Sequence, residues 1–228
     1  MRKLFIALLI VGIMPAISAC TKSEPKTDDQ KALYAIGAMM SKQMQILSLT
    51  PEELEFVKRG LTDSVTGKKL IVEPEAYQQK VTEFAQARIK ATTEKQTAKS
   101  KAYLEGAAKE KDAQKTESGL VYIPVKEGTG KQPQETDRVK VHYEGKLIDG
   151  TVFDSSVKRG QPAEFPLNGV IKCWGEGLTK MKVGGKAKII CPAELAYGEQ
   201  GRPPIIPGGS ALIFDVELLD IVNPPANK

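Results

Sequence analysis

The chain has 228 residues, of which 41% are hydrophobic and 27% are charged. This composition is typical of a globular protein of one or two domains. The formal net charge of +5 is too small to indicate nucleic-acid binding, and the sequence has no basic patch interleaved with aromatic residues. We therefore expect no nucleic-acid partner.

The N-terminus has the pattern of an export signal. Arg2 and Lys3 precede an apolar run that is of signal-peptide length and too short for a comfortable bilayer span. The small residues before Cys20 resemble the lipobox of bacterial lipoproteins, in which that cysteine becomes the lipidated first residue. An ordinary secretory signal that ends at Ala19 is the alternative. We expect a signal peptide over residues 1–19, and an exported, lipid-anchored protein of the bacterial cell envelope, at the outer membrane on its periplasmic side or surface.

Export changes the interpretation of the two remaining cysteines, Cys173 and Cys191. Disulfides persist in an oxidising compartment, whereas two cysteines without a nearby histidine are too few for a zinc site. We expect these cysteines to form a disulfide, with two buried free thiols as the alternative. The sequence predicts neither a metal nor a cofactor.

After a polar tether over residues 20–29, the first part of the fold is predicted to be helical. Apolar residues recur every three or four positions between Leu33 and Leu47. A second helix begins at Thr50 with the pattern of a capping box. These narrow apolar faces are too small to fold alone, so we expect residues 30–72 to form a helical dimerisation module. A ligand groove lined by the methionines of this segment is the alternative.

A third helix is predicted from Pro74 to about Lys115. Gly106 is its only internal glycine, and beyond Ile89 the apolar stripe gives way to Lys, Glu and Gln. A helix of about 60 Å, at 1.5 Å per residue, is too long and too polar to be buried in one small domain. We therefore expect residues 73–117 to be a long connecting helix.

From residue 118 onward the pattern changes to short strands. A turn signal at Asp149 and Gly150 predicts a hairpin, and a short helix fits between Cys173 and Met181. The fold class is therefore α+β, with an antiparallel sheet wrapped around a short helix in residues 118–228. The strands are expected at residues 120–123, 138–147, 186–191 and 211–222.

Conventional catalytic groups are scarce in this C-terminal half. His142 is the only histidine, and its strand alternation turns it away from the face of Tyr143, so we interpret it as structural or solvent-facing. The sequence has no nucleophile elbow, phosphate loop, metal cluster or Ser/His/Asp set. Trp174 is the only tryptophan, and it is either a core residue or the floor of a site.

The C-terminal half contains a series of short motifs, in the order Val141–Gly145, Val152–Ser156, Val170–Trp174, Ala196–Gly198, Ile205–Pro207 and Leu212–Leu218. In this order the motifs resemble the FKBP-type peptidyl-prolyl isomerases. The helical N-terminal region and the long helix resemble the Mip-like (macrophage infectivity potentiator) subgroup of bacterial lipoproteins, whose members are V-shaped homodimers.

This resemblance implies a pocket for proline. Trp174 would be the indole floor, Asp154 a buried acid beside the pocket, and Tyr197 a phenol that hydrogen-bonds a ligand. The backbone N–H of Ile206 would donate to a ligand carbonyl. A turn cap for Asp154 and a packing role for Tyr197 are the alternatives. The apolar walls would be Tyr143, Phe153, Val170, Ile171 and Phe214.

Two positions depart from the family pattern. Ala163 stands where many members have a wall phenylalanine, with Phe165 two residues on, and we expect a wider pocket as a result. Cys173 stands where glycine is usual, which bears on the geometry of the helix start.

The expected activity is isomerisation of X–Pro bonds in unfolded or loop segments of exported proteins. Rotation about such a bond moves no proton and breaks no covalent bond, so an apolar pocket that favours the twisted amide is sufficient. The expected partners are these proline-containing segments, a second copy of the chain, a membrane through the lipid anchor, and macrolide immunophilin inhibitors. A dimeric holdase chaperone or binding module is the second hypothesis, and a surface virulence or adhesion factor is the third.

Overall fold

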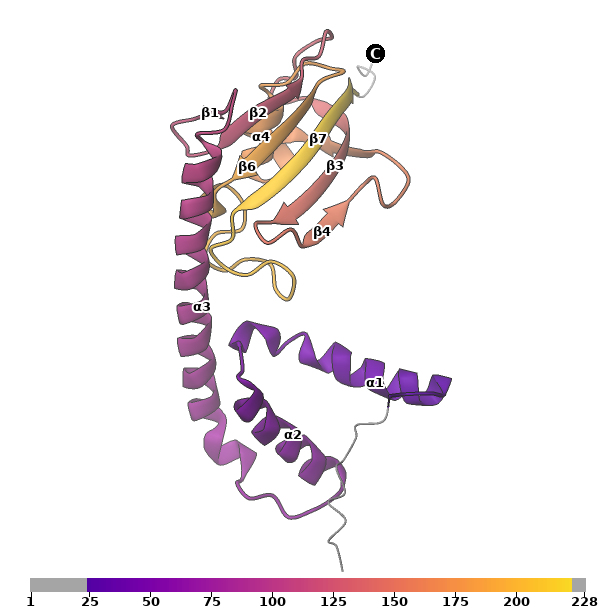
Figure 1. The fold of residues 1–228 in the computed structure, drawn as a ribbon, viewed down its shortest axis with the longest axis vertical. Coiled ribbons are helices and arrows are strands. Elements are labelled where there is room, and N and C mark those ends of the chain that lie inside the picture. The colour runs from indigo at the N-terminus through magenta and orange to yellow at the C-terminus, as the bar shows by residue number, and fades with distance from the viewer. Residues whose placement is uncertain (1–23, 223–228) are drawn as a thin grey trace, which may run out of the picture. The chain divides into compact units, whose positions relative to one another are not determined.

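Figure 1 shows the computed structural model of the chain, in which residues 24–222 are described. The predicted signal peptide and the lipidation of Cys20 lie outside the described residues. The chain divides into two compact units, Met1–Met39 and Met40–Lys228. Within residues 24–222, no helix is both long enough and apolar enough to cross a membrane.

Helix α1, Asp28–Ser41, is shorter than its apolar periodicity predicted. Acidic residues in its first turn favour the helix N-terminus, and none of its residues is buried. The prediction of a helical face that continues to Leu47 is wrong, because the 3-10 helix η1, Gln45–Leu47, follows as a separate turn. Ser48 then adopts a left-handed conformation with φ of 47°, which a continuing helix cannot accommodate.

Helix α2, Pro51–Val65, begins with the predicted capping box. The Thr50 hydroxyl accepts a hydrogen bond from the Glu53 N–H at 3.2 Å, and the Glu53 carboxylate accepts one from the Thr50 N–H at 2.8 Å. Glu53 also pairs with Arg88 of the next long helix. The hydrogen bond from Thr50, reinforced by Arg88, lowers the pKa of the Glu53 carboxyl. One residue therefore both starts α2 and joins it to its neighbour.

Helix α3, Gln78–Ala107, corrects the predicted connecting helix at both ends. Pro74–Tyr77 forms a 3-10 turn, η2, and the helix ends well before Lys115. Its 30 residues span about 45 Å. Its last residue, Ala107, packs onto the sheet. The helix cannot reach Lys115 because Asp112 takes a positive φ of 63°, and the chain then joins the sheet as a strand.

Seven antiparallel strands form one sheet in the order β1-β2-β6-β7-β3-β4, with β5 paired to β3 (Figure 1). The predicted strands and the α+β class are confirmed, and β1 and β5 were not predicted. The strands are β1 Gln114–Lys115, β2 Val121–Lys126, β3 Arg138–Leu147, β4 Val152–Ser155, β5 Ala163–Pro166, β6 Lys186–Cys191 and β7 Leu212–Ile221.

Both faces of the sheet are apolar. On one face, the inward residues of β3, β6 and β7 enclose the short helix α4, Lys172–Leu178, in the main core. On the other face, Val121, Ile123, Ile190 and Ile213 pack with Ala107 at the end of α3. Strands β2, β6 and β7 therefore contribute residues to both cores, and α3 is not only a connector.

Candidate active site

Trp174 lies on α4 at the centre of the main core and is 4% exposed. The backbone N–H of Trp174 closes the first helical turn by donating to the Ile171 carbonyl at 2.9 Å. The indole Nε1 makes no hydrogen bond within the described residues, so aromatic neighbours hold the ring. Three rings pack edge-on against it, from Tyr143 at 5.0 Å, Phe214 at 5.3 Å and Phe165 at 5.4 Å between ring centroids. This T-shaped geometry is one that aromatic pairs prefer.

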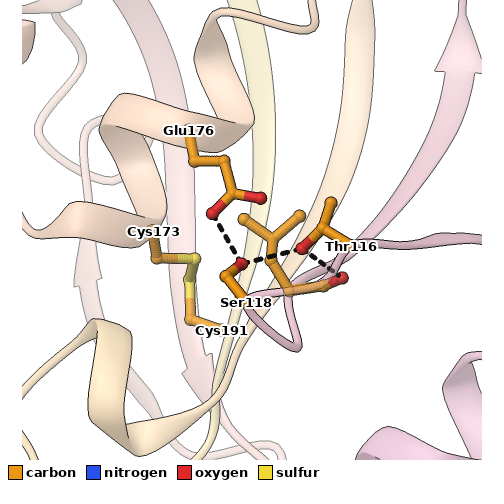
Figure 2. The surroundings of a disulfide bond; sticks show 6 residues. Thr116, Ser118, Cys173, Glu176 and Cys191 are labelled. Carbon is orange, nitrogen blue, oxygen red and sulfur yellow. Dashed lines mark hydrogen bonds between the residues drawn. A yellow bond between two sulfur atoms is a disulfide. The ribbon is translucent and has the colours of Figure 1, made fainter.

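Two links outside the pocket fix α4 (Figure 2). Cys173 and Cys191 form a disulfide with their Cα atoms 5.7 Å apart, which ties the residue before Trp174 to the end of β6. Ser118 in the turn between β1 and β2 donates to the Glu176 carboxylate at 2.7 Å. The helix under the pocket is therefore attached to two separate parts of the sheet.

The aromatic cluster borders a pocket of about 640 Å³, within the usual range for small-ligand sites. All nine site residues that the sequence predicted line this pocket. They are Tyr143, Phe153, Asp154, Val170, Ile171, Trp174, Tyr197, Ile206 and Phe214.

A polar corner lies at the edge of the pocket. The Tyr143 hydroxyl donates to the Asp154 carboxylate, and Arg159 donates both to Asp154 and, at 3.0 Å, to the Tyr143 oxygen. Burial acts to raise the pKa of Asp154, but the hydrogen bonds from Tyr143 and Arg159 outweigh it and leave this pKa below its usual value. Burial and the bond to Asp154 raise the pKa of Tyr143. At neutral pH the corner thus holds an ionised Asp154 and a neutral Tyr143.

The loop between β6 and β7 forms another wall. Tyr197, Arg202, Pro203, Ile205 and Ile206 of this loop line the pocket. The Ile206 N–H, expected to be a donor for a ligand, donates instead to the Arg202 carbonyl at 3.0 Å. A tight turn in the loop thus uses this N–H in the structure, and its hydrogen bond to a ligand carbonyl stays a prediction.

The two departures from the family pattern are now explained. Phe165 rather than Ala163 lines the pocket, while Ala163 packs against the core on the same strand, β5. The ring two residues on supplies a wall where Ala163 has none, so the pocket keeps an aromatic side there. Cys173 leaves the start of α4 intact, since the Trp174 N–H still meets the Ile171 carbonyl.

Sequence reasoning missed several residues at the site. Arg159 follows β4 in an exposed turn, where no periodicity marks it. Only its charge, five residues after Asp154, could have suggested an ion pair.

His142 lies outside this pocket, with Nδ1 3.2 Å from the Ser156 hydroxyl, consistent with a structural interpretation. The other lining residues absent from the predicted set are Phe165, Gly169, Arg202, Pro203 and Ile205.

The described part of the chain offers no site for a metal ion of the usual kind. Within residues 24–222, no three His, Cys, Asp or Glu side chains gather closely enough to hold one. What the pocket offers instead is an apolar aromatic cavity with one charged, hydrogen-bonded edge.

Comparison with known proteins agrees with this geometry. A family model described as FKBP-type peptidyl-prolyl cis-trans isomerase matches residues 129–219, and one described as the domain amino terminal to such isomerases matches residues 29–123. The FKBP-type peptidyl-prolyl cis-trans isomerase FkpA of Escherichia coli K12 is 42% identical over 224 residues, which cover 92% of this chain and 82% of that protein. The chain belongs to the FKBP-type peptidyl-prolyl cis-trans isomerases.

Further relatives place it within this family. The peptidyl-prolyl cis-trans isomerase Mip of Coxiella burnetii is 39% identical, with 97% of this chain and 99% of that one covered. The crystal structure of FkpA from Escherichia coli superposes with a TM-score of 0.67 at 40% identity, over 88% of this chain and 99% of that one. The protein is thus an isomerase of X–Pro bonds, and the alternative of a dimeric holdase chaperone or binding module in which isomerase activity is secondary is not favoured.

Proposed function

We propose that this isomerase acts on proline-containing segments of exported proteins by seating the proline ring over Trp174. The aromatic pocket carries the proposal: one buried indole, edge-on rings from Tyr143, Phe165 and Phe214, and a cavity of about 640 Å³. A flat apolar floor with ring edges around it suits a small saturated ring. It offers no group that would attack the substrate covalently.

The proposed mechanism is selective binding of the twisted amide. Rotation about an X–Pro bond breaks amide resonance, and the barrier to uncatalysed rotation is about 18–20 kcal/mol. The twisted form has lost conjugation and is less dipolar than the planar form, so an apolar pocket favours it. A thousandfold acceleration needs only about 4 kcal/mol of such differential binding.

In this mechanism the polar corner has a positioning role. The Tyr143 ring is held from two sides, since it packs edge-on against Trp174 and its hydroxyl is hydrogen-bonded to Asp154 and Arg159. The Arg159 guanidinium also lies over the Tyr143 ring, 5.6 Å from its centroid. A wall fixed in advance need not be ordered when substrate binds, so more of the binding free energy remains for the transition state.

Two variants test this assignment in the mature chain. Trp174→Leu removes the floor and Asp154→Ala removes the acid, and both should slow cis–trans exchange of an X–Pro peptide and the refolding of a proline-limited protein. Lys126→Ala, on β2 outside the pocket lining, is the control and should retain activity. Aggregation suppression is measured in parallel. If both variants keep wild-type isomerase rates, the pocket assignment fails; if they lose isomerase activity but still suppress aggregation, a separate chaperone activity is present.

We also propose that the N-terminal helices form a homodimer. Large apolar side chains are exposed on each helix by itself, such as Leu33 at 68% on α1 and Phe56 at 70% on α2. Exposed apolar faces of this size usually mark an interaction surface, and the match to the amino-terminal family domain supports a second copy as the partner. Sedimentation equilibrium at micromolar concentration should give a dimer. Phe56→Glu should shift it toward monomer, while Glu52→Gln on the same helix should not.

The subcellular localisation of the protein is a further proposal. The N-terminal charge, apolar run and Cys20 favour a lipid-anchored protein of the bacterial cell envelope. Mass spectrometry of the mature chain should find acyl groups on Cys20. A mature chain that begins at Cys20 without acyl groups would support the ordinary secretory signal instead.

Binding of a macrolide immunophilin inhibitor, and the loss of that binding in Trp174→Leu, tests the predicted inhibitor class.

A further inference from the structure

The pocket wall between β6 and β7 is a pinched loop, residues 196–211, which we call the pocket loop. It supplies five of the residues that line the cavity, including Tyr197 and Ile206. Its two arms meet where the Gly209 N–H donates to the Gly198 carbonyl at 2.9 Å. A Cβ at Gly208 would lie 1.8 Å from the Glu199 carbonyl oxygen, so the neck of the loop has no space for side chains.

The neck lies directly against α3. The Ser100 hydroxyl donates to the Gly209 carbonyl at 2.8 Å and accepts from the Ala211 N–H at 2.8 Å. Ser100 is 4% exposed, and only it and Ala107 are buried among the residues of α3. Two more hydroxyl residues of the same helix face, Thr93 and Thr97, stand where a Cβ at Gly208 or Gly209 would meet them.

Several contacts farther along α3, and one just beyond its end, do not depend on Ser100. Ala107, with Tyr103 and Leu104, packs into the second core, and Glu110 pairs with Lys188 at 3.6 Å. These contacts lie on the C-terminal side of Ser100 and hold the helix against the sheet by themselves. Loss of the Ser100 hydroxyl should therefore loosen the neck of the pocket loop without releasing the helix.

We propose that α3 positions the pocket loop and that Ser100 is a positioning residue for the isomerase reaction. Only a few residues separate the neck from Ile206, so a shift at Gly209 is transmitted to the wall. The neck has no side-chain packing of its own, and without Ser100 a buried carbonyl and a buried N–H would both lose their partner. The rate of isomerisation thus depends on a helix outside the isomerase sheet. This inference rests on the proposed role of the pocket.

The test uses the full mature chain with three substitutions on α3. Ser100→Ala removes the hydroxyl, Ser100→Thr keeps it, and Thr82→Ala is the control, because the Thr82 hydroxyl bonds only within the helix, to the Gln78 carbonyl at 3.0 Å. Each change is compatible with a helix. The readouts are kcat/KM on an X–Pro peptide, affinity for a macrolide inhibitor, and the amide chemical shifts of Tyr197 and Ile206.

Ser100→Ala should lower kcat/KM and inhibitor affinity by about three- to tenfold, the scale of losing one or two buried hydrogen bonds. The Tyr197 and Ile206 amides should shift, while that of Leu178 in the core should not. Ser100→Thr should restore all three readouts, and Thr82→Ala should match wild type. Rates are expressed per inhibitor-titrated site, so partial unfolding cannot imitate the effect.

Wild-type kcat/KM and affinity in Ser100→Ala would overturn the proposal. A loss that Ser100→Thr does not restore, or one that Thr82→Ala shares, would overturn it as well. Trp174→Leu is measured alongside. If that variant keeps full activity, the pocket assignment has failed and the positioning role fails with it. If it loses activity while Ser100→Ala does not, only the positioning role has failed.

Discussion

Replacement of Gly145 by alanine should displace two aromatic rings that line the pocket. Gly145 is buried on β3, where its pairing partner is Phe214 of β7. A Cβ at this position would lie 2.6 Å from the Phe153 Cζ and 3.0 Å from the Phe214 Cε1. Both atoms belong to rings that line the pocket, and the two rings contact each other edge-on with centroids 5.6 Å apart. One methyl group therefore displaces two walls at once.

The magnitude follows from overpacking. An added carbon in a well-packed core costs about 1–3 kcal/mol. For a domain of about 100 residues, 1 kcal/mol lowers Tm by roughly 4 °C, so Gly145→Ala should melt roughly 4–12 °C below wild type. Because displaced walls misplace the substrate by a fraction of an ångström or more, kcat/KM on an X–Pro peptide should fall at least about tenfold.

Gly106→Ala is the matched control for this prediction. A Cβ at Gly106, inside α3, would meet no heavy atom within 4 Å. The same chemical change should there leave the rate unchanged and stabilise the helix by about 0.5–1 kcal/mol. Calorimetry and the peptide assay decide the outcome. If Gly145→Ala melts with wild type and keeps its kcat/KM, the rings have freedom to move aside and the reasoning is refuted.

Four further predictions concern the links around the site and the N-terminal helices. The double variant Cys173→Ala/Cys191→Ala should lose about 3 kcal/mol in urea unfolding, given the sequence separation of 18, and two free thiols in denatured, oxidised protein would contradict the disulfide. The folded-state pKa of Asp154 is lowered, so its stabilising effect is complete above its unfolded pKa of about 3.9 and is lost as pH falls through the lower folded value. The stability difference between wild type and Asp154→Asn should accordingly be constant from about pH 8 to 5 and shrink below about pH 4; a difference that shrinks near pH 6 would contradict it. Arg159→Ala should lower kcat/KM about three- to tenfold with little change in Tm, and Arg159→Lys should not restore it because a compact ammonium cannot reproduce the planar fork that reaches Asp154 and Tyr143 from two nitrogens. Thr50→Ala should destabilise α2 by about 1 kcal/mol, measured by helical circular dichroism on heating, whereas an unchanged melt would show that the capping box contributes nothing.

The elements that the sequence predicted well are those whose signal is local. β3 has the predicted bounds because its apolar residues alternate over the whole strand, and β6 because Ala187 and Ile189 alternate with lysines before the apolar end of the strand. α2 begins where predicted because Thr50 and Glu53 satisfy each other's N–H groups within one turn. Such patterns need no knowledge of the rest of the chain.

The elements that were missed depend on distant contacts. β5 has four residues and ends in proline, so it is a strand only because Phe165 and its neighbours pair with β3. α3 ends at Ala107, which packs on strands that come later in the sequence, and Asp112 with its positive φ then leads the chain into β1. Helix propensity alone would have continued through the following lysines, which is why the predicted helix was too long.

The residues of the candidate site fall into the same two groups, those with a local sequence signal and those that depend on distant contacts. Its nine predicted residues came from a motif resemblance, and all nine line one pocket. The residues that organise the pocket from outside carry no such motif. Arg159 acts through an exposed turn, and Ser100 reaches the Gly209 carbonyl across 109 positions of sequence.

A polar helix with one buried serine is also informative in retrospect. Serine has a lower helix propensity than the Lys, Glu and Gln residues that surround it, so on an exposed connector it offers no advantage. It becomes useful only where its hydroxyl replaces a missing backbone partner, as it does for Gly209 and Ala211. The serine at position 100, its burial and its two hydrogen bonds are explained together only if α3 belongs to the isomerase site as well as to the N-terminal helices.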